Sequence, residues 1–176
     1  MKAPARYLII VALLTLPGFL VAQTPQSNES LPITPERLLA VLAGTWDFDE
    51  YSEGSPGPVG SGQREMRLSA DSMKLIWTES FVGRSDNDTG ILGYNSATGA
   101  YYVLGALTHE PSPMILIGRA DRSGRAVVFD VASTDIRLAK RGIYVTSELR
   151  LLDADHFEWG ASDGRGRVVF NRIGHP

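Results

Sequence analysis

The stretch Leu42-Ala43-Gly44-Thr45-Trp46-Asp47-Phe48 marks the change from a helical pattern to a strand pattern. Residues 34–41 before it predict one short helix, because Thr34 can cap its N-terminus and a proline suits the first helical position. Gly44 is expected to end this helix. Residues 45–51 then alternate between apolar and polar, which predicts a strand whose buried face carries Trp46.

Short alternating segments separated by turn signals fill the rest of the chain. The expected strands are 45–51, 63–69, 73–82, 90–95, 100–107, 114–120, 125–131, 143–151, 156–161 and 167–173. The stretch 53–62, rich in glycine and proline, is expected to be a loop, and 133–141 is either a loop or one helical turn.

The predicted fold class is all-β: an antiparallel up-and-down β-barrel of about ten strands with a short N-terminal helix. Helical patterns do not alternate with the strands, which excludes a parallel α/β sheet. The connections are short, so sequence neighbours are expected to pair, and a long meander removes its exposed edges by closing. A Greek-key sandwich is the alternative.

The N-terminal residues 1–22 are typical of a signal peptide. Lys2 and Arg6 precede the largely apolar run 7–21, which ends before the small residue Ala22. This run is short for a membrane span, which needs about 20 residues, and an uncleaved anchor is the alternative. Residues 23–33 are expected to be a flexible linker and 34–176 the barrel domain. The predicted localisation is therefore exported, either periplasmic or secreted.

Charge and cysteine content exclude several classes of function. The chain has 17 Lys and Arg against 20 Asp and Glu. The leader holds two of those bases and no acid, so 15 against 20 leaves a mature chain of −5. A mildly acidic chain without a basic run is a poor candidate for nucleic-acid binding. The absence of cysteine excludes disulfides, a thiolate nucleophile and a cysteine-based metal site, and is compatible with export.

Three segments resemble a known family. They are Leu42-Ala43-Gly44-Thr45-Trp46, Thr89-Gly90-Ile91-Leu92-Gly93-Tyr94-Asn95 and Leu152-Asp153-Ala154-Asp155-His156-Phe157-Glu158. A Gly-X-Trp that begins a first strand after a short helix resembles the calycin superfamily, which includes the lipocalins. More narrowly, the three segments resemble a bacterial family catalogued as a domain of unknown function with a lipocalin-like barrel.

This resemblance covers residues from about Pro35 to Arg172 and implies a barrel with no established activity, so no catalytic residue is carried over. In calycins an arginine near the end of the last strand stacks on the Gly-X-Trp tryptophan. The implied structural signature here is Gly44, Trp46 and Arg172. Trp46 either floors a cavity or plugs the closed end of the barrel, and the second is the commoner role. Lipocalins usually pair two cysteines, and this chain has none.

Glu79 is the sharpest candidate for a functional side chain. It shares strand parity with Trp77 and Phe81, so its carboxylate is expected to point inward, where it is costly unless paired or solvated. Arg64 is the expected partner across the hairpin, and Glu50 is expected to point inward into the same polar cluster. The cluster is interpreted either as a structural ion pair at a water-filled mouth, or as an anchor for the polar end of a ligand.

The histidines His109, His156 and His175 are not at metal-ligand spacing, so neither a metal nor a cofactor is predicted. His109, in the loop 108–113, is interpreted as a solvated loop residue, or as a residue that gates the mouth or binds haem iron as in some haem-binding calycins. The candidate ligand-binding residues are therefore Glu79, Arg64, Trp77, Glu50 and His109. Motifs of the Gly-X-Ser-X-Gly, Ser-X-X-Lys and HEXXH types are absent, and no catalytic residue is assigned.

Three hypotheses about function remain. The first is non-enzymatic binding of a small, mostly apolar ligand in the barrel lumen. It expects the inward positions to include Met66, Leu104, Ala106, Met114, Gly118 and Val145. The second is a structural or interaction protein of the cell envelope with a filled barrel and the loop 53–62 as its contact. The third, least favoured, is an enzyme that uses Glu79 as a general acid or base. Ligand identity and oligomeric state stay open.

Overall fold

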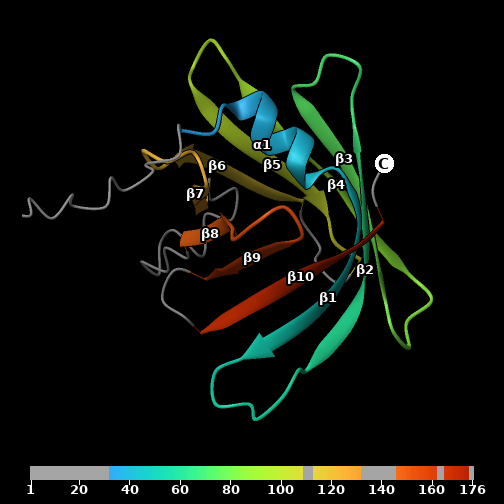
Figure 1. The fold of residues 1–176 in the computed structure, drawn as a ribbon. Helices are drawn as coiled ribbons and strands as arrows, with labels where there is room; N and C mark the ends of the chain where they lie inside the picture. The colour runs from blue at the N-terminus through green and yellow to red at the C-terminus, as the bar shows by residue number, and fades with distance from the viewer. Residues whose placement is uncertain (1–31, 109–112, 132–145, 162–164, 175–176) are drawn as a thin grey trace, which may run out of the picture. The chain divides into compact units, whose positions relative to one another are not determined.

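The computed structural model describes residues 32–108, 113–131, 146–161 and 165–174, and within these ranges the chain forms one helix and a barrel (Figure 1). The helix is α1 (Pro35–Leu42). The strands are β1 (Gly44–Ser52), β2 (Gly60–Leu68), β3 (Lys74–Phe81), β4 (Asn87–Asn95), β5 (Ala100–Ala106), β6 (Met114–Ala120), β7 (Ala126–Val131), β8 (Thr146–Leu151), β9 (His156–Ala161) and β10 (Gly166–Gly174).

Each strand pairs antiparallel with the next strand in the chain, and β10 pairs with β1 to close the ring. The register of the closing pair runs from Thr45 opposite Gly174 to Ser52 opposite Gly166. This arrangement confirms the predicted all-β, up-and-down barrel with a short helix at its start, and it excludes the sandwich.

Helix α1 forms where the sequence predicts it. The Thr34 side chain accepts a hydrogen bond from the Arg37 amide at 3.3 Å, Pro35 occupies the first turn, and the helix ends at Leu42. Gly44 is the first residue of β1 rather than the end of the helix, and its φ of +135° is a backbone conformation that L side chains rarely adopt. The segment before the helix also joins the barrel, because the Ile33 amide donates to the Ser123 carbonyl at 2.8 Å.

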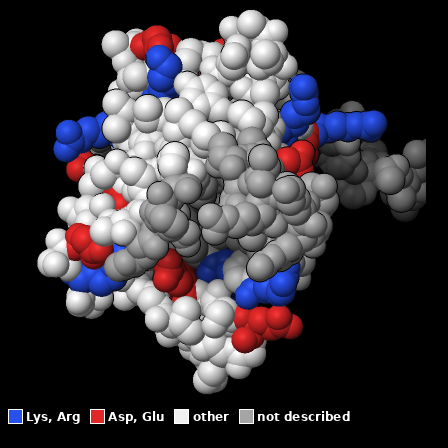
Figure 2. Space-filling view, turned by 180° about the vertical axis from the view of Figure 1, so that it is seen from behind, with Lys and Arg blue, Asp and Glu red and all other residues white. Residues whose placement is uncertain are grey.

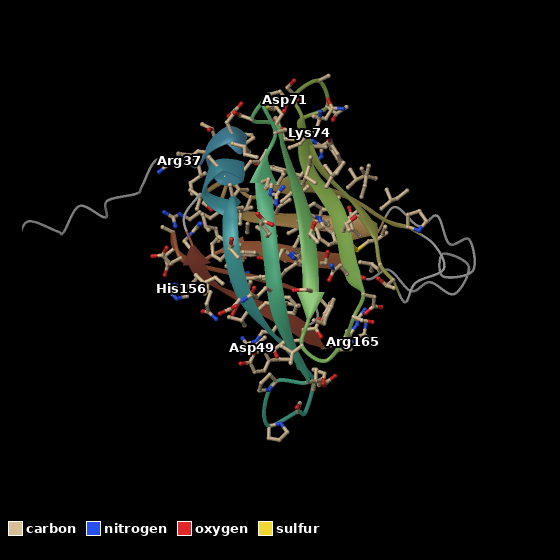
Figure 3. The ribbon with its side chains drawn as sticks, turned by 90° about the vertical axis from the view of Figure 1, so that its right-hand side faces the viewer. Arg37, Asp49, Asp71, Lys74, His156 and Arg165 are labelled. Atoms are coloured by element: carbon tan, nitrogen blue, oxygen red, sulfur yellow. The ribbon has the colours of Figure 1, made fainter. Side chains whose placement is uncertain are left out.

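The barrel has a near end, which α1 adjoins, and an opposite far end. At the near end, α1 leads into β1, and its buried residues Leu38, Leu39 and Leu42 join the core. At the far end, odd-numbered strands finish and even-numbered strands begin. Figure 3 shows Arg37, Asp71 and Lys74 at the near end, and Asp49 and Arg165 toward the far end. Within the described ranges, no helix has the length and apolar character that a membrane crossing requires.

Aromatic and aliphatic side chains pack the half of the barrel next to α1. Trp46, Phe157 and Phe170 are fully buried, with Phe157 stacked on Phe170 at 4.1 Å between ring centroids and edge-on to Trp46 at 4.7 Å. Leu75, Leu149 and their neighbours complete this core. Trp46 therefore belongs to the packed core of this half of the barrel.

Gly60 and Gly62 lie in β2, so the loop expected over 53–62 is shorter than predicted and ends at residue 59. These glycines make room for side chains across the strand pair, where Gly62 faces Phe48 and Gly60 faces Glu50. A Cβ on Gly62 would lie 2.6 Å from the Phe48 ring. These glycines therefore leave space for neighbouring side chains within a strand. Composition alone does not distinguish such glycines from those of a turn.

The inward parity expected for β5 is wrong. Leu104 and Ala106 lie on the exposed outer face, whereas Tyr101, Val103 and Gly105 are buried. This strand carries apolar residues on both faces, so its alternation does not identify the buried one. Of the other expected inward positions, Met66 and Gly118 are buried, Met114 is half-buried, and Val145 lies outside the described residues.

Candidate functional site

An ion pair in the barrel interior links β2 and β3. Arg64 and Glu79 are direct partners in the strand register, and Arg64 Nε donates to Glu79 Oε2 at 2.7 Å. Arg64 Nη2 donates to the same oxygen, and only 11% of the Arg64 side chain and 6% of the Glu79 side chain remain exposed. The inward pointing of Glu79 and its pairing with Arg64 are as the sequence predicts.

Three aromatic rings surround the Arg64 guanidinium. Its central carbon lies 4.5 Å from the Phe170 ring centroid, 4.9 Å from that of Trp77 and 5.7 Å from that of Trp159. Such contacts stabilise a cation by about 0.5–2 kcal/mol, more as water is excluded. The aromatic rings and Glu79 together hold the guanidinium within the barrel.

The Trp77 indole lies close to the barrel wall, where two glycines leave room for it. Trp77 lies opposite Gly90, and Gly90 lies opposite Gly105 on the next strand. A Cβ on Gly90 would collide with the indole, and one on Gly105 would touch it at 3.5 Å. Trp77 Nε1 is buried and has no hydrogen-bond partner among the described residues. Trp77 is thus placed between the wall and Arg64.

A second charged group lies on the neighbouring strand and loop. Asp88 is buried and accepts hydrogen bonds from the Thr108 amide at 2.7 Å and the Thr108 hydroxyl at 2.9 Å. Arg84 lies 4.0 Å from the Asp88 carboxylate, donates to Asp86 at 3.1 Å, and covers the Phe81 ring at 4.1 Å. Both residues are therefore engaged by protein groups.

Glu50 differs from the other acids of this region. Its half-buried carboxylate lies over Gly60, and no described residue donates a hydrogen bond to it. Burial, and then the nearby negative charge of Glu79, raise the pKa of Glu50, while Arg84 and Arg64 act in the opposite direction. Of the two glutamates predicted to point inward, Glu79 is bound to Arg64, and Glu50 is the one available to a ligand.

A pocket of about 370 Å³ opens at the far end, beside Glu50. Its described lining is Glu50, Tyr51, Val59, Ser147, Trp159, Gly160, Ala161, Gly166, Arg167 and Val168. Ser147 Oγ is buried and lacks a hydrogen-bond partner among the described residues. Trp159 is stacked on Phe129, with 5.5 Å between centroids and 10° between planes, which fixes the orientation of its indole. This far-end pocket combines apolar walls with two unpartnered oxygen groups.

Sequence reasoning missed Trp159, Ser147, Asp88 and Arg84. Trp159 shares parity with Phe157 in a predicted strand, so its inward position could have been found. Ser147 lies in the alternating segment 143–151 but carries no distinctive signal. Asp88 and Arg84 fall in a polar stretch that reads as a turn, although β4 begins at Asn87.

The predicted signature residues form a separate cluster at the near end. The Arg172 guanidinium lies over the Trp46 ring, as the resemblance implies, and donates to the carbonyls of Val41 and Ala43 at the end of α1. Gly44 leaves room for that guanidinium, because a Cβ there would collide with it. The cluster is remote along the strands from Glu50 and Glu79, and its contacts are structural.

Among the histidines, His156 contacts Asp153, with 2.7 Å between Nδ1 and Oδ1. His109 and His175 lie outside the described residues. In the part of the chain that the structure describes, no three His, Asp or Glu side chains gather in a way that could hold a metal ion. On the face seen in Figure 2, acidic and basic side chains lie beside one another rather than in separate fields.

No protein-family model matches the sequence. No curated protein matches it either. Among solved structures, the chain is similar to a redesigned β-barrel at 15% sequence identity and a TM-score of 0.41, over 78% of this chain and 96% of the other.

Proposed function

We propose that this barrel binds a small, mostly apolar molecule at its far end, without catalysing a reaction. The observation that carries the proposal is the far-end pocket. There the Glu50 carboxylate and the Ser147 hydroxyl, which have no hydrogen-bond partner among the described residues, lie beside the apolar surface of Trp159 and Val168. Pockets that bind small molecules commonly combine a largely apolar lining with a few polar groups that orient the ligand.

The polar anchor in this proposal is Glu50 rather than the Arg64–Glu79 pair. Arg64 Nε and Nη2 both donate to one oxygen of Glu79, and three rings surround the guanidinium. The protein thus already engages both charges, and we assign this pair a structural role at the floor of the site. Trp77 supports the same ion pair through the contact of its ring with the Arg64 guanidinium. His109 keeps its predicted role as a candidate residue of the same site.

The wider assignments are part of the same proposal. We infer a lipocalin-like, calycin-type barrel of the bacterial family of unknown function, supported by the residues 42–46 at the start of β1 and by the contact of Arg172 with Trp46. Residues 1–22 are proposed as a signal peptide, 23–33 as a linker and 34–176 as the barrel domain, which gives an exported protein.

Binding of a neutral apolar probe tests the proposed function. The full chain is titrated with decanol while tryptophan fluorescence is recorded, and native mass spectrometry counts the bound molecules. Trp159→Leu is expected to weaken decanol binding about tenfold, because it removes the stacked wall of the pocket. Ile117→Ala is the matched control, since Ile117 is 45% exposed on the outer wall of β6.

The alternative is an interaction protein with a filled barrel, and the packing of the half next to α1 favours it. It predicts that decanol does not bind, and that protein purified from its own cell envelope carries no small molecule in native mass spectra. Either result would count against the ligand-binding proposal.

A further inference from the structure

We propose that the molecule bound in the far-end pocket carries a positively charged head, an ammonium group, and that Glu50 is its counter-ion. This inference rests on the proposed function and adds the charge of the ligand to it.

Among the residues that the structure describes, the interior of the far end holds more acid than base. Glu50, Glu79 and Asp88 face two guanidinium groups, those of Arg64 and Arg84. Arg64 is bound to Glu79, and Arg84 contacts both Asp88 and Asp86. Among the described residues, Glu50 is the acid of this group that has no ion pair, so a bound cation would complete the set, whereas an anion would meet like charge.

Arg167 also lines the pocket, but its guanidinium is directed to the outer wall. It lies 3.5 Å from the Glu158 carboxylate and 5.5 Å from the Tyr51 ring centroid, and 58% of its side chain is exposed. These contacts engage the Arg167 guanidinium with Glu158 and Tyr51. The other charged side chain among the described lining residues is Glu50.

The immediate surroundings of Glu50 favour a cation over water as its partner. The neighbouring lining is Val59, Val168 and the glycine beneath the carboxylate, and burial raises the pKa of Glu50. A half-buried carboxylate gains more from a charged donor than from a neutral one, because charge-assisted hydrogen bonds are about twice as strong as neutral ones. An ammonium group supplies both the charge and the donors.

Trp159 provides an aromatic surface at the pocket for a cationic head. Tryptophan has the most favourable ring face for cations, and stacking on Phe129 holds this indole at the edge of the pocket. Arg64 already lies 5.7 Å from the same ring, so the indole is in contact with one cation. The unpartnered Ser147 hydroxyl can accept a further hydrogen bond from an ammonium group.

Three ten-carbon probes that differ only in their heads test the inference: decylammonium, decanol and decanoate. Each is titrated at pH 7 and low salt into the full chain, below the concentration at which it forms micelles. Decylammonium is expected to bind about tenfold more tightly than decanol, from an ion pair and a cation–π contact, and decanoate more weakly than decanol.

Glu50→Gln is expected to remove the preference for decylammonium while decanol binds as in the wild type. Glu65→Gln, an exposed carboxylate on the outer face of β2, makes the same change of net charge and is expected to keep the preference. If Glu50→Gln does not fold, as judged by circular dichroism, Glu50→Asp replaces it and is expected to reduce but retain the preference.

The outcomes separate this inference from the proposed function. Equal binding of decanol and decylammonium overturns the cationic head and leaves the binding pocket in place. Tightest binding of decanoate also overturns it and assigns the head to an arginine such as Arg167. If none of the three probes binds, the proposed function itself fails. A preference for decylammonium that survives Glu50→Gln removes Glu50 as the counter-ion.

Discussion

Arg172, near the end of β10, lies over the Trp46 indole with its guanidinium carbon 4.0 Å from the ring centroid. The same guanidinium donates to the Ala43 carbonyl at 2.8 Å and to the Val41 carbonyl, while Trp46 Nε1 donates to the Leu42 carbonyl at 3.0 Å. Carbonyls at the end of a helix have no partner within the helix. The two side chains therefore satisfy the end of α1 and tie it to both strands that close the barrel.

Arg172→Met is expected to destabilise the protein by about 3–5 kcal/mol, because it leaves buried carbonyls unpaired and removes the stacked cation. Arg172→Lys keeps the charge but not the forked donor, so it is expected to recover only part of this loss. Urea unfolding measures both. The control is Arg167→Met on the same strand, whose exposed ion pair contributes about 0–1 kcal/mol. Equal stabilities of Arg172→Met and the control would contradict the assignment.

The buried Arg64–Glu79 pair is expected to show strong coupling in a double-mutant cycle. Arg64→Met alone leaves Glu79 buried without its cation and is expected to cost about 3–5 kcal/mol. Glu79→Gln in the Arg64→Met background is expected to recover part of that loss, with a coupling energy of about 1–3 kcal/mol. Urea unfolding of all four proteins gives the value, and purely additive effects would show that the pair does not act as a unit.

Glu50→Gln is expected to raise the stability of the protein at pH 7. Burial and Glu79 raise the Glu50 pKa on folding, so the folded state binds this proton more tightly than the unfolded state. The resulting stability is fully present below the unfolded pKa and is lost as pH rises through the folded pKa. A glutamine at position 50 is neutral at every pH, so the variant keeps this stability at pH 7.

Thermal unfolding across pH checks this sign. The gain of Glu50→Gln over the wild type should shrink as the pH falls toward about 4, where glutamate is itself protonated. Glu65 serves as the control, because its hydrogen bond with Arg67 lowers its pKa. Glu65→Gln should therefore give no gain at pH 7. A Glu50→Gln variant that is less stable than the wild type at pH 7 would mean that Glu50 has a stabilising partner.

Gly90→Ala is expected to destabilise the barrel by about 1–3 kcal/mol, because the added Cβ would collide with the Trp77 indole and the Leu104 carbonyl. The near-ultraviolet circular dichroism of tryptophan should change with it. Gly57→Ala is the control, since a Cβ there meets no atom within 4 Å. Unchanged dichroism in Gly90→Ala would show that the indole does not depend on this glycine.

Much of the fold could be predicted because the local signals agree with one another. The Thr34 cap, the alternation that starts at Thr45 and the hairpins that follow it all predict the same meander. Glu79 and Arg64 could be paired from parity alone, because a charge on an otherwise apolar face requires a partner.

The remaining features depend on contacts between strands that parity does not reveal. Gly60 and Gly62 read as loop residues because their use as space for Phe48 and Glu50 requires the strand register. Leu104 was placed on the wrong face because β5 is apolar on both sides. The far-end pocket brings Glu50 together with Trp159, from strands that are distant in sequence and joined only through β10.

The pairing of β10 with β1 has a consequence for how the domain is made. Until residues 166–174 have been synthesised, β1 lacks a pairing strand on one side, and so does β9 once it has been made. A growing chain therefore carries unpaired strand edges until β10 is complete, and such edges can pair with other chains. Ring closure joins the most distant parts of the domain, which favours slow assembly after synthesis and makes any product that stops short of β10 prone to aggregation.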